Sequence, residues 1–159
     1  MIKSKCCFTG HRQIDEKDIP MLEKKLMKEV ERLIRKGIMF FFTGGALGFD
    51  TLAALTVIKL KQKYPRIQLV LALPCKGQAD RWKTEDRILY ERIKYLADNV
   101  IYTSPYYFDG CMQVRNRYLV NHSDICISYQ KRQTGGTSYT VNYCKEKGIP
   151  VINLADKIR

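Results

Sequence analysis

The sequence predicts an α/β protein built on a single Rossmann-like, doubly wound and mainly parallel sheet with helices on both faces. Short apolar segments alternate with amphipathic helical segments along the chain, and glycine or proline closes many of them. Such alternation favours a parallel sheet, and right-handed crossovers then place helices on both faces. The length of 159 residues suits one hydrophobic core, so residues 1–159 are expected to form a single domain.

Apolar runs, and the glycines that end them, predict the first strands and the first helix. Residues 5–9 form a short buried strand that Gly10 ends. Residues 18–36 form a helix that Gly37 ends, because apolar side chains recur on one face, namely Leu22, Leu26, Val30, Leu33 and Ile34. The apolar run 38–43 then predicts the second strand.

The middle of the chain repeats this order. A helix over 47–64 stops at Pro65, and a strand over 67–73 stops at Pro74. Residues 81–97 form the next helix, because apolar residues again share one face: Ile88, Leu89, Ile93 and Leu96.

The last third adds three more strands and two helices. The strands are expected at 100–102, 124–129 and 149–153, and the helices at 112–122 and 138–147. Between the strand at 100–102 and the next helix lies a long aromatic loop, 103–110. This loop is either a flap over a site or part of a dimer interface.

The composition limits the function classes. The net charge is +12, from 28 basic and 16 acidic residues, and such a field attracts phosphates, nucleic acid or an acidic partner. The basic residues are spread through helical stretches, so most of them are interpreted as solvated surface. No apolar stretch approaches the roughly 20 residues of a membrane span, and no signal-peptide pattern is present. A cytoplasmic protein without a membrane partner is expected.

The six cysteines do not predict a metal site. None forms a C-x-x-C pair, and the chain has only two histidines. Cys6, Cys7 and Cys126 lie inside apolar strand-like runs, where cysteine usually acts as a small buried hydrophobe. No metal and no obligatory cofactor are expected.

Two glycine pairs, each between a strand and a helix, are the most informative motifs. The first motif comprises Thr43, Gly44, Gly45, Gly48 and Asp50, and the second comprises Thr134, Gly135, Gly136, Thr137 and Ser138. Backbone N–H groups at a helix N-terminus form a site for phosphate. Alternatively, the first motif is a turn whose glycines supply positive φ and whose Asp50 caps the helix. Two such loops together favour nucleotide binding.

Other candidate ligand-binding residues follow the remaining strands, where doubly wound sheets hold their ligands. They are Gly10, His11 and Arg12 after the first strand, Trp82 after the third, and Arg115 with Asn116 after the fourth. An arginine guanidinium can donate two parallel hydrogen bonds to a phosphate, and the carboxylate of Asp50 can accept hydrogen bonds from sugar hydroxyls. Trp82 either stacks on a base or anchors its helix. The helix at 112–122 is expected to turn Val114, Tyr118 and Leu119 toward the core.

Five segments together resemble the SLOG superfamily, which includes the LOG phosphoribohydrolases and DprA, and most of all its YpsA-like branch. They are residues 8–12, 43–54, 71–82, 115–124 and 134–140. The resemblance implies a Rossmann-like fold, a nucleotide-type ligand at the glycine loops, and a homodimer or higher homo-oligomer. LOG enzymes carry a catalytic glutamate where this chain has Thr140. A hydroxyl does not supply the charge or proton transfer of a carboxylate.

The sequence therefore predicts binding of a nucleotide or nucleotide-derived ligand, of ADP-ribose or dinucleotide type, by a bacterial-type sensor or regulator. One alternative is a LOG-type nucleotide phosphoribohydrolase, for which Asp50 and Arg115 are the catalytic candidates. A second alternative is DprA-like binding of single-stranded DNA, and binding of nucleic acid is expected to be weak.

Overall fold

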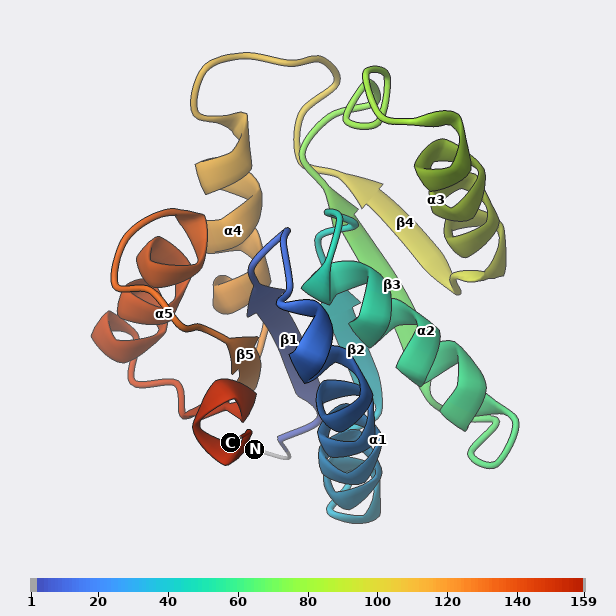
Figure 1. The fold of residues 1–159 in the computed structure, drawn as a ribbon, viewed down its shortest axis with the longest axis vertical. Helices are drawn as coiled ribbons and strands as arrows, with labels where there is room; N and C mark the ends of the chain where they lie inside the picture. Colours follow the sequence, from blue (N-terminus) through green and yellow to red (C-terminus); the bar gives the residue numbers. More distant parts are fainter. Residues whose placement is uncertain (1–2, 159) are drawn as a thin grey trace.

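The sheet is continuous and fully parallel. The computed structural model describes residues 3–158, so residues 1, 2 and 159 of the expected domain lie outside the described part. The strands are β1 (Lys5–Gly10), β2 (Phe40–Thr43), β3 (Gln68–Leu73), β4 (Asn99–Tyr102), β5 (Ile125–Tyr129) and β6 (Val151–Asn153). They form one six-stranded sheet in the order β4-β3-β2-β1-β5-β6 (Figure 1). The predicted fold class is confirmed.

Five α-helices connect the strands. They are α1 (Ile19–Arg35), α2 (Phe49–Lys61), α3 (Thr84–Leu96), α4 (Cys111–Asn121) and α5 (Gly136–Glu146). Two short 3₁₀ helices, η1 (Glu16–Asp18) and η2 (Leu154–Lys157), were not predicted from the sequence. Among the described helices, none combines the length and the apolar character that crossing a membrane requires.

The strand order reverses between β1 and β5. The chain lays down β1 to β4 in one direction, returns through α4, and adds β5 and β6 on the other side of β1. The register pairs Cys6 with Ile125 and continues to Gly10 with Tyr129, so β1 and β5 end together. In open α/β sheets a ligand binds outside the carboxyl ends of the strands at such a switch point.

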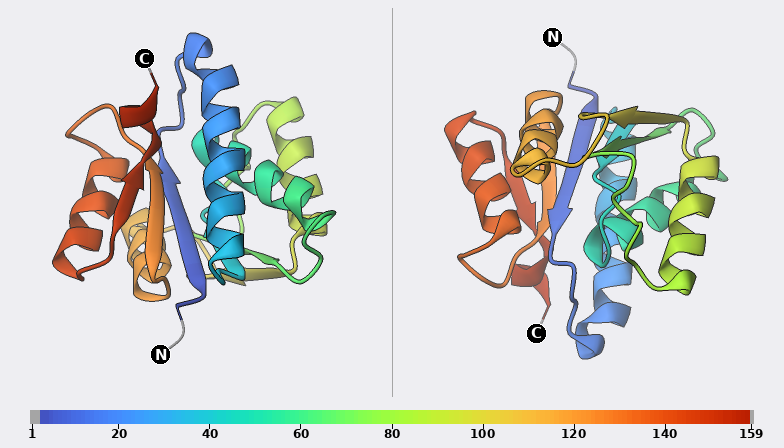
Figure 2. Two further views of the ribbon diagram at one scale, coloured as in Figure 1. Left: turned by 90° about the horizontal axis from the view of Figure 1, so that it is seen from below. Right: turned by 90° about the horizontal axis from the view of Figure 1, so that it is seen from above.

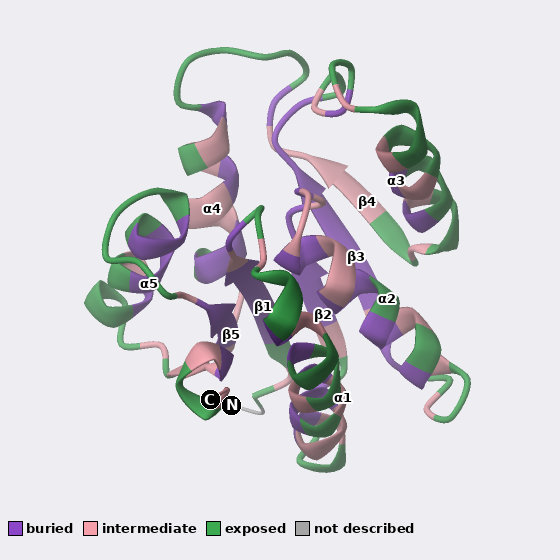
Figure 3. Ribbon diagram, in the orientation of Figure 1, coloured by how far each residue is buried: buried purple, intermediate pink, exposed green. Residues whose placement is uncertain are grey.

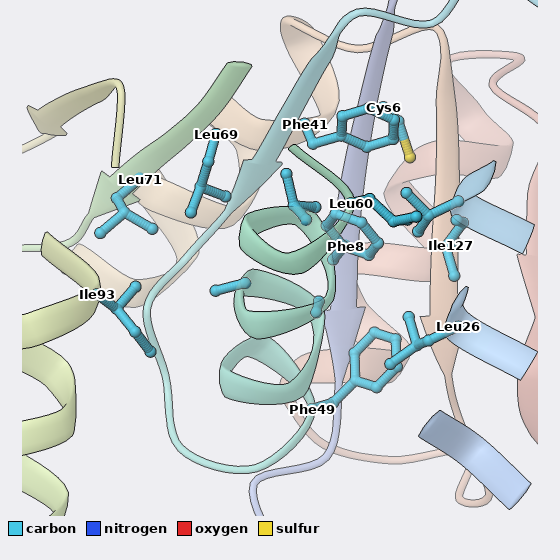
Figure 4. Packing of buried hydrophobic residues seen from close by; sticks show 14 of the residues in the cluster. Cys6, Phe8, Leu26, Phe41, Phe49, Leu60, Leu69, Leu71, Ile93 and Ile127 are labelled. Atoms are coloured by element: carbon cyan, nitrogen blue, oxygen red, sulfur yellow. The ribbon is translucent and has the colours of Figure 1, made fainter. Parts of the chain in front are cut away.

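Different helices cover the two faces of the sheet (Figure 2). On β1, Phe8 belongs to the larger core with residues of α1, α2 and α3, whereas Cys7 belongs to the smaller core under α4 and α5. This alternation follows from the period of two along a strand. In the larger core, the ring of Phe8 packs against the rings of Phe41 and Phe49 (Figure 4). The predicted core face of α1 is confirmed, with Leu22, Leu26, Val30 and Leu33 buried.

The cysteines are buried as expected. Cys6, Cys7 and Cys126 are at most 1% exposed, and all the cysteines are free thiols. Cys7 and Cys126 are paired across β1 and β5, and Cys144 of α5 packs over them in the smaller core. These thiols act as small apolar side chains there.

Several helix boundaries differ from the prediction. Helix α2 begins at Phe49 rather than at Leu47, because Gly48 has φ of +77° and is not helical. Helix α3 begins at Thr84 rather than at Arg81, since Lys83 is extended. Helix α5 begins two residues earlier than expected, so Gly136 is its first residue.

Candidate ligand-binding site

A polar cleft of about 400 Å³ lies at the switch point, where β1 and β5 end. It brings together ten of the predicted residues: Gly10, His11, Arg12, Asp50, Arg115, Asn116, Thr134, Gly135, Gly136 and Thr137. These residues come from both sides of the switch point and from segments more than 120 positions apart, so only the folded sheet assembles them. The cleft therefore lies where doubly wound sheets bind their ligands.

The second glycine loop is open. A Cβ added to Gly135 or Gly136 would meet nothing within 4 Å, and Gly135 has φ of +93°. Both residues line the cleft at the N-terminus of α5, where the helix dipole and free backbone N–H groups favour an anion. The hydroxyl of Ser138 does not join them, because it donates to the carbonyl of Gln133 from a buried position.

The first glycine loop is packed inward instead. A Cβ on Gly44 would lie 2.5 Å from Nη1 of Arg115, and a Cβ on Gly45 would lie 2.5 Å from Leu73. At Gly48, where φ is +77°, a Cβ would lie 2.3 Å from the carbonyl oxygen of Arg12. The glycines of this loop thus permit close internal packing. The same holds for Gly10, whose missing side chain leaves room for the ring of Phe49.

Arg115 and Asp50 place two buried charges at the floor of the cleft. Arg115 is 4% exposed; its Nη1 donates to the Gly44 carbonyl at 2.5 Å and its Nε donates to Asn116 Oδ1 at 2.8 Å. Asp50 is 6% exposed and accepts a hydrogen bond from the backbone N–H of Ala46 at 3.1 Å. Burial raises the pKa of the Asp50 carboxyl, whereas the charge of Arg115 acts in the opposite direction. Burial lowers the pKa of Arg115, which still remains a cation at neutral pH.

The position of Arg115 corrects one detail of the helix prediction. The inward face of α4 runs through Cys111, Arg115 and Leu119, which are all buried, while Val114 is only partly buried. A basic residue therefore occupies a core-facing position. Spacing alone favoured Val114 because an apolar residue is the default for such a face.

His11 is a buried imidazole that lines the cleft. It is 5% exposed, and its Nε2 accepts a hydrogen bond from the backbone N–H of Lys131 at 2.8 Å. The other ring nitrogen, Nδ1, lies 3.4 Å from Nη2 of Arg132, which also can only donate, so both ring nitrogens face donors. Burial lowers the pKa of the imidazole, and the positive charges of Arg132 and Lys131 lower it further.

Two exposed arginines complete the positive lining. Arg12 makes one weak contact, from Nη2 to the sulfur of Met112 at 4.0 Å, and Arg132 approaches His11. Lys131 is instead neutralised, because its Nζ lies 2.7 Å from Asp15 and 2.9 Å from Asp18. Sequence analysis missed Arg132. Its position in the loop after β5, directly before the second glycine motif, was the signal that could have identified it.

Six predicted residues are absent from the lining of this cleft: Gly44 and Ser138, described above, and Thr43, Gly45, Gly48 and Trp82. Trp82, Gly45 and Gly48 line a separate, mainly apolar pocket of about 310 Å³ beside α2 and α3. Thr43 is fully buried, and its hydroxyl donates to the backbone carbonyl of Asp50. Arg12 and Asp50 line both the cleft and the apolar pocket, so the two hollows share a wall.

Among the described residues, no group of three or more His, Cys, Asp or Glu side chains is placed to hold a metal ion. Thr140, at the position of the LOG glutamate, points its hydroxyl back to the carbonyl of Gly136 within α5, at 2.9 Å. Asp50 is the one carboxylate that lines the cleft in the described chain.

Solved structures of two DNA processing proteins share the fold. The protein from Helicobacter pylori, studied for its single-stranded DNA binding mode, superposes with a TM-score of 0.67 at 19% identity, over 94% of this chain and 64% of that one. DprA from Streptococcus pneumoniae also gives 0.67, at 15% identity, over 94% of this chain and 49% of that one. The chain thus spans less than two thirds of either protein.

The region matched by this chain is a larger share of two sequence relatives than of these solved structures. An uncharacterized SPbeta prophage-derived protein, YoqJ of Bacillus subtilis, is 33% identical over 138 residues, which are 79% of this chain and 81% of YoqJ. The UPF0398 protein BH1768 of Halalkalibacterium halodurans is 32% identical over 136 residues, covering 84% and 72%. The YpsA family model, described as the YspA SLOG family, matches residues 6–149. The chain therefore belongs to the YspA SLOG family.

Proposed function

We propose that the protein binds a nucleotide-derived ligand of ADP-ribose or dinucleotide type in the polar cleft and acts as a sensor or regulator. The observation that carries the proposal is that the open N-terminus of α5 and the buried pair Arg115 and Asp50 line one cleft at the switch point. A helix N-terminus with unobstructed glycines suits phosphate, and a buried carboxylate suits sugar hydroxyls.

Each group has a distinct role in this proposal. Phosphate oxygens accept hydrogen bonds from backbone N–H groups at Gly135 and Gly136, and the guanidinium groups of Arg12 and Arg132 neutralise their charge. Asp50 accepts hydrogen bonds from the sugar. Arg115 positions the floor of the cleft, because its hydrogen bond fixes the Gly44 carbonyl.

Binding without turnover is the better supported form of this function. A phosphoribohydrolase needs a carboxylate at the reacting bond, and the hydroxyl of Thr140 is engaged inside its own helix. Asp50 is the remaining carboxylate of the cleft in the described residues, and it already accepts a hydrogen bond from the backbone N–H of Ala46. Self-association and a cytoplasmic location also remain proposals.

Gly136→Asp tests the phosphate site. The new carboxylate sits at a helix N-terminus, where an acid favours folding, but it repels a phosphate from the cleft. Calorimetry and thermal shift with a nucleotide panel should show binding to the wild type. A ligand at about 100 times its dissociation constant adds roughly 2.7 kcal/mol of stability. Gly136→Asp should lose this shift while remaining folded by circular dichroism.

Thr84→Asp is the matched control. It places the same acid at the exposed first residue of α3, which does not line the cleft, so ligand binding should not change. Unchanged affinity in a folded Gly136→Asp protein would refute the proposed phosphate site. Absence of heat and of thermal shift across the whole nucleotide panel would refute the proposed function.

A further inference from the structure

The apolar pocket beside the cleft is lined by aliphatic and aromatic side chains. Its walls include Leu89 and Ile93 of α3 and Leu52 of α2, and its volume is about 310 Å³. Trp82 and Tyr90 line it as an edge-to-face pair, with ring centroids 5.1 Å apart. Concave sites with mostly apolar walls and few polar groups are typical of small-molecule binding, and aromatic side chains offer faces for a base.

The pocket and the cleft are two compartments of one region. Gly45, Leu47 and Gly48 line the pocket, whereas Ala46 between them lines the cleft, so this short loop separates the two. Arg12 and Asp50 line both compartments. Arg12 is exposed and makes no ion pair among the described residues, so its charge is available to a group that passes from one compartment to the other.

The distance between the far ends limits the length of the ligand. The phosphate end of the cleft lies after β5, and the pocket reaches Leu71 of β3. The sheet order places three strand steps between β5 and β3, which is about 14 Å at the usual spacing of parallel strands. A ligand that joins the pocket to the N-terminus of α5 therefore has to extend across about three strand spacings.

We infer that the apolar pocket receives the purine base of a nucleoside diphosphate whose sugar lies at Asp50, on the shared wall, and whose phosphates pass Arg12 toward the N-terminus of α5 in the polar cleft. The base stacks against Trp82, and the half-buried carboxylate of Asp86 at the pocket accepts a hydrogen bond from its amino group. This inference rests on the proposed function and deepens it, because it names the base subsite and the ligand class.

The fluorescence of Trp82 can report ligand binding in the apolar pocket. It is the only tryptophan of the chain, so its emission reports on this pocket alone. Four probes separate the compartments: ADP-ribose, AMP, adenosine and ribose 5-phosphate. ADP-ribose and AMP should quench Trp82, whereas ribose 5-phosphate should give calorimetric heat without quenching. ADP-ribose should bind at least about tenfold more tightly than ribose 5-phosphate, as expected for one stacked base.

Trp82→Ala should remove that preference, so that ADP-ribose binds about as weakly as ribose 5-phosphate. The affinity for ribose 5-phosphate itself should not change. Tyr95→Ala, an exposed aromatic position on α3 outside the pocket, should bind both ligands like the wild type. Trp82→Phe keeps an aromatic face and should retain most of the preference, which separates stacking from a folding defect.

Two results would overturn the inference. If ADP-ribose and ribose 5-phosphate bind equally well and Trp82 emission stays constant, the pocket holds no base, although the cleft still binds phosphate. If none of the four probes gives heat or quenching, the proposed function fails together with the inference. Quenching by adenosine alone, with no heat from ribose 5-phosphate, would support the base pocket and contradict the phosphate site.

Discussion

Arg115 donates a hydrogen bond from Nη1 to the carbonyl oxygen of Gly44 at 2.5 Å. The bond joins the helix that follows the aromatic loop to the turn that follows β2, 71 positions earlier in the chain. Both partners are buried, and the guanidinium of Arg115 fills the space that a side chain on residue 44 would need. The shape of the cleft floor depends on this contact.

Gly44→Ala should therefore displace Arg115. The added Cβ would lie 2.5 Å from Nη1, and overpacking of this kind costs roughly 1–3 kcal/mol. Chemical denaturation should show that loss, and calorimetry should show weaker binding of nucleotide. Gly136→Ala is the control for stability alone, because its Cβ meets nothing within 4 Å and the free energy of unfolding should not fall. Equal stability of Gly44→Ala and the wild type would contradict this account of the glycine.

Stability should rise with pH in the range where His11 titrates. Its pKa is lower in the folded protein than the usual 6.5 or so of an unfolded chain, because burial and two cations disfavour the charged ring. The unfolded state thus binds more protons between the lowered value and about pH 6.5, and the free energy of unfolding increases with pH across that window. Above this window the His11 contribution is constant.

Denaturant melts of the wild type and of His11→Gln between pH 5 and pH 7.5 measure this effect. The difference between the two proteins isolates His11, because the other titrating groups are common to both. The His11→Gln protein should show a shallower pH dependence. The same slope in both proteins would mean that the imbalance in proton binding has another source.

Hydrolysis of nucleoside monophosphates should be absent or very slow. Thr140 replaces the LOG glutamate, and its hydroxyl is bonded within α5. Chromatography for released free base is the direct assay, and turnover near about 1 per second, within the ordinary enzyme range, would overturn the expectation. In that event, loss of the activity in Asp50→Asn would identify the carboxylate that replaces the glutamate.

Asp50→Asn is also informative for binding alone. The amide keeps an oxygen acceptor for the N–H of Ala46 but removes the charge that strengthens hydrogen bonds to a sugar. Affinity for ADP-ribose should fall by about tenfold, since a hydrogen bond to a charged group contributes roughly 1.5–3 kcal/mol. Affinity for inorganic phosphate, whose proposed site is at α5, serves as the control and should change little.

Single-stranded DNA should bind weakly and lose nearly all affinity between about 50 and 200 mM salt, as counterion release requires. Most of the aromatic loop is exposed, as the green segment between β4 and α4 in Figure 3 shows. Tyr106 and Tyr107 in it are 71% and 65% exposed, so their rings are free to stack on bases. Fluorescence anisotropy with a labelled oligonucleotide at both salt concentrations measures the binding. Tight binding at 200 mM salt that Tyr107→Ala reduces would place DNA binding ahead of nucleotide sensing.

The positions of the strands along the chain were largely predictable, because strands buried on both faces are continuous apolar runs such as Phe40 to Phe42. The two glycine pairs looked alike in sequence, yet one is open and the other is filled by Arg115 and Leu73. That difference depends on side chains tens of positions away, which periodicity does not reveal. For the same reason, sequence analysis grouped Trp82 with the cleft, although it lines the neighbouring pocket.

The switch point also divides the chain into two parts that each hold half of a site. Residues 5–102 carry the first glycine loop, Arg12 and the apolar pocket, and residues 111–153 carry Arg115 and the second glycine loop. The aromatic loop between them is exposed at its tip, and β1 pairs with β5 across the two parts. We therefore expect two fragments cut at this loop to reassociate through the β1–β5 pairing. Neither fragment alone has a complete cleft. Recovery of ligand binding after mixing would therefore report directly on reassembly of the sheet.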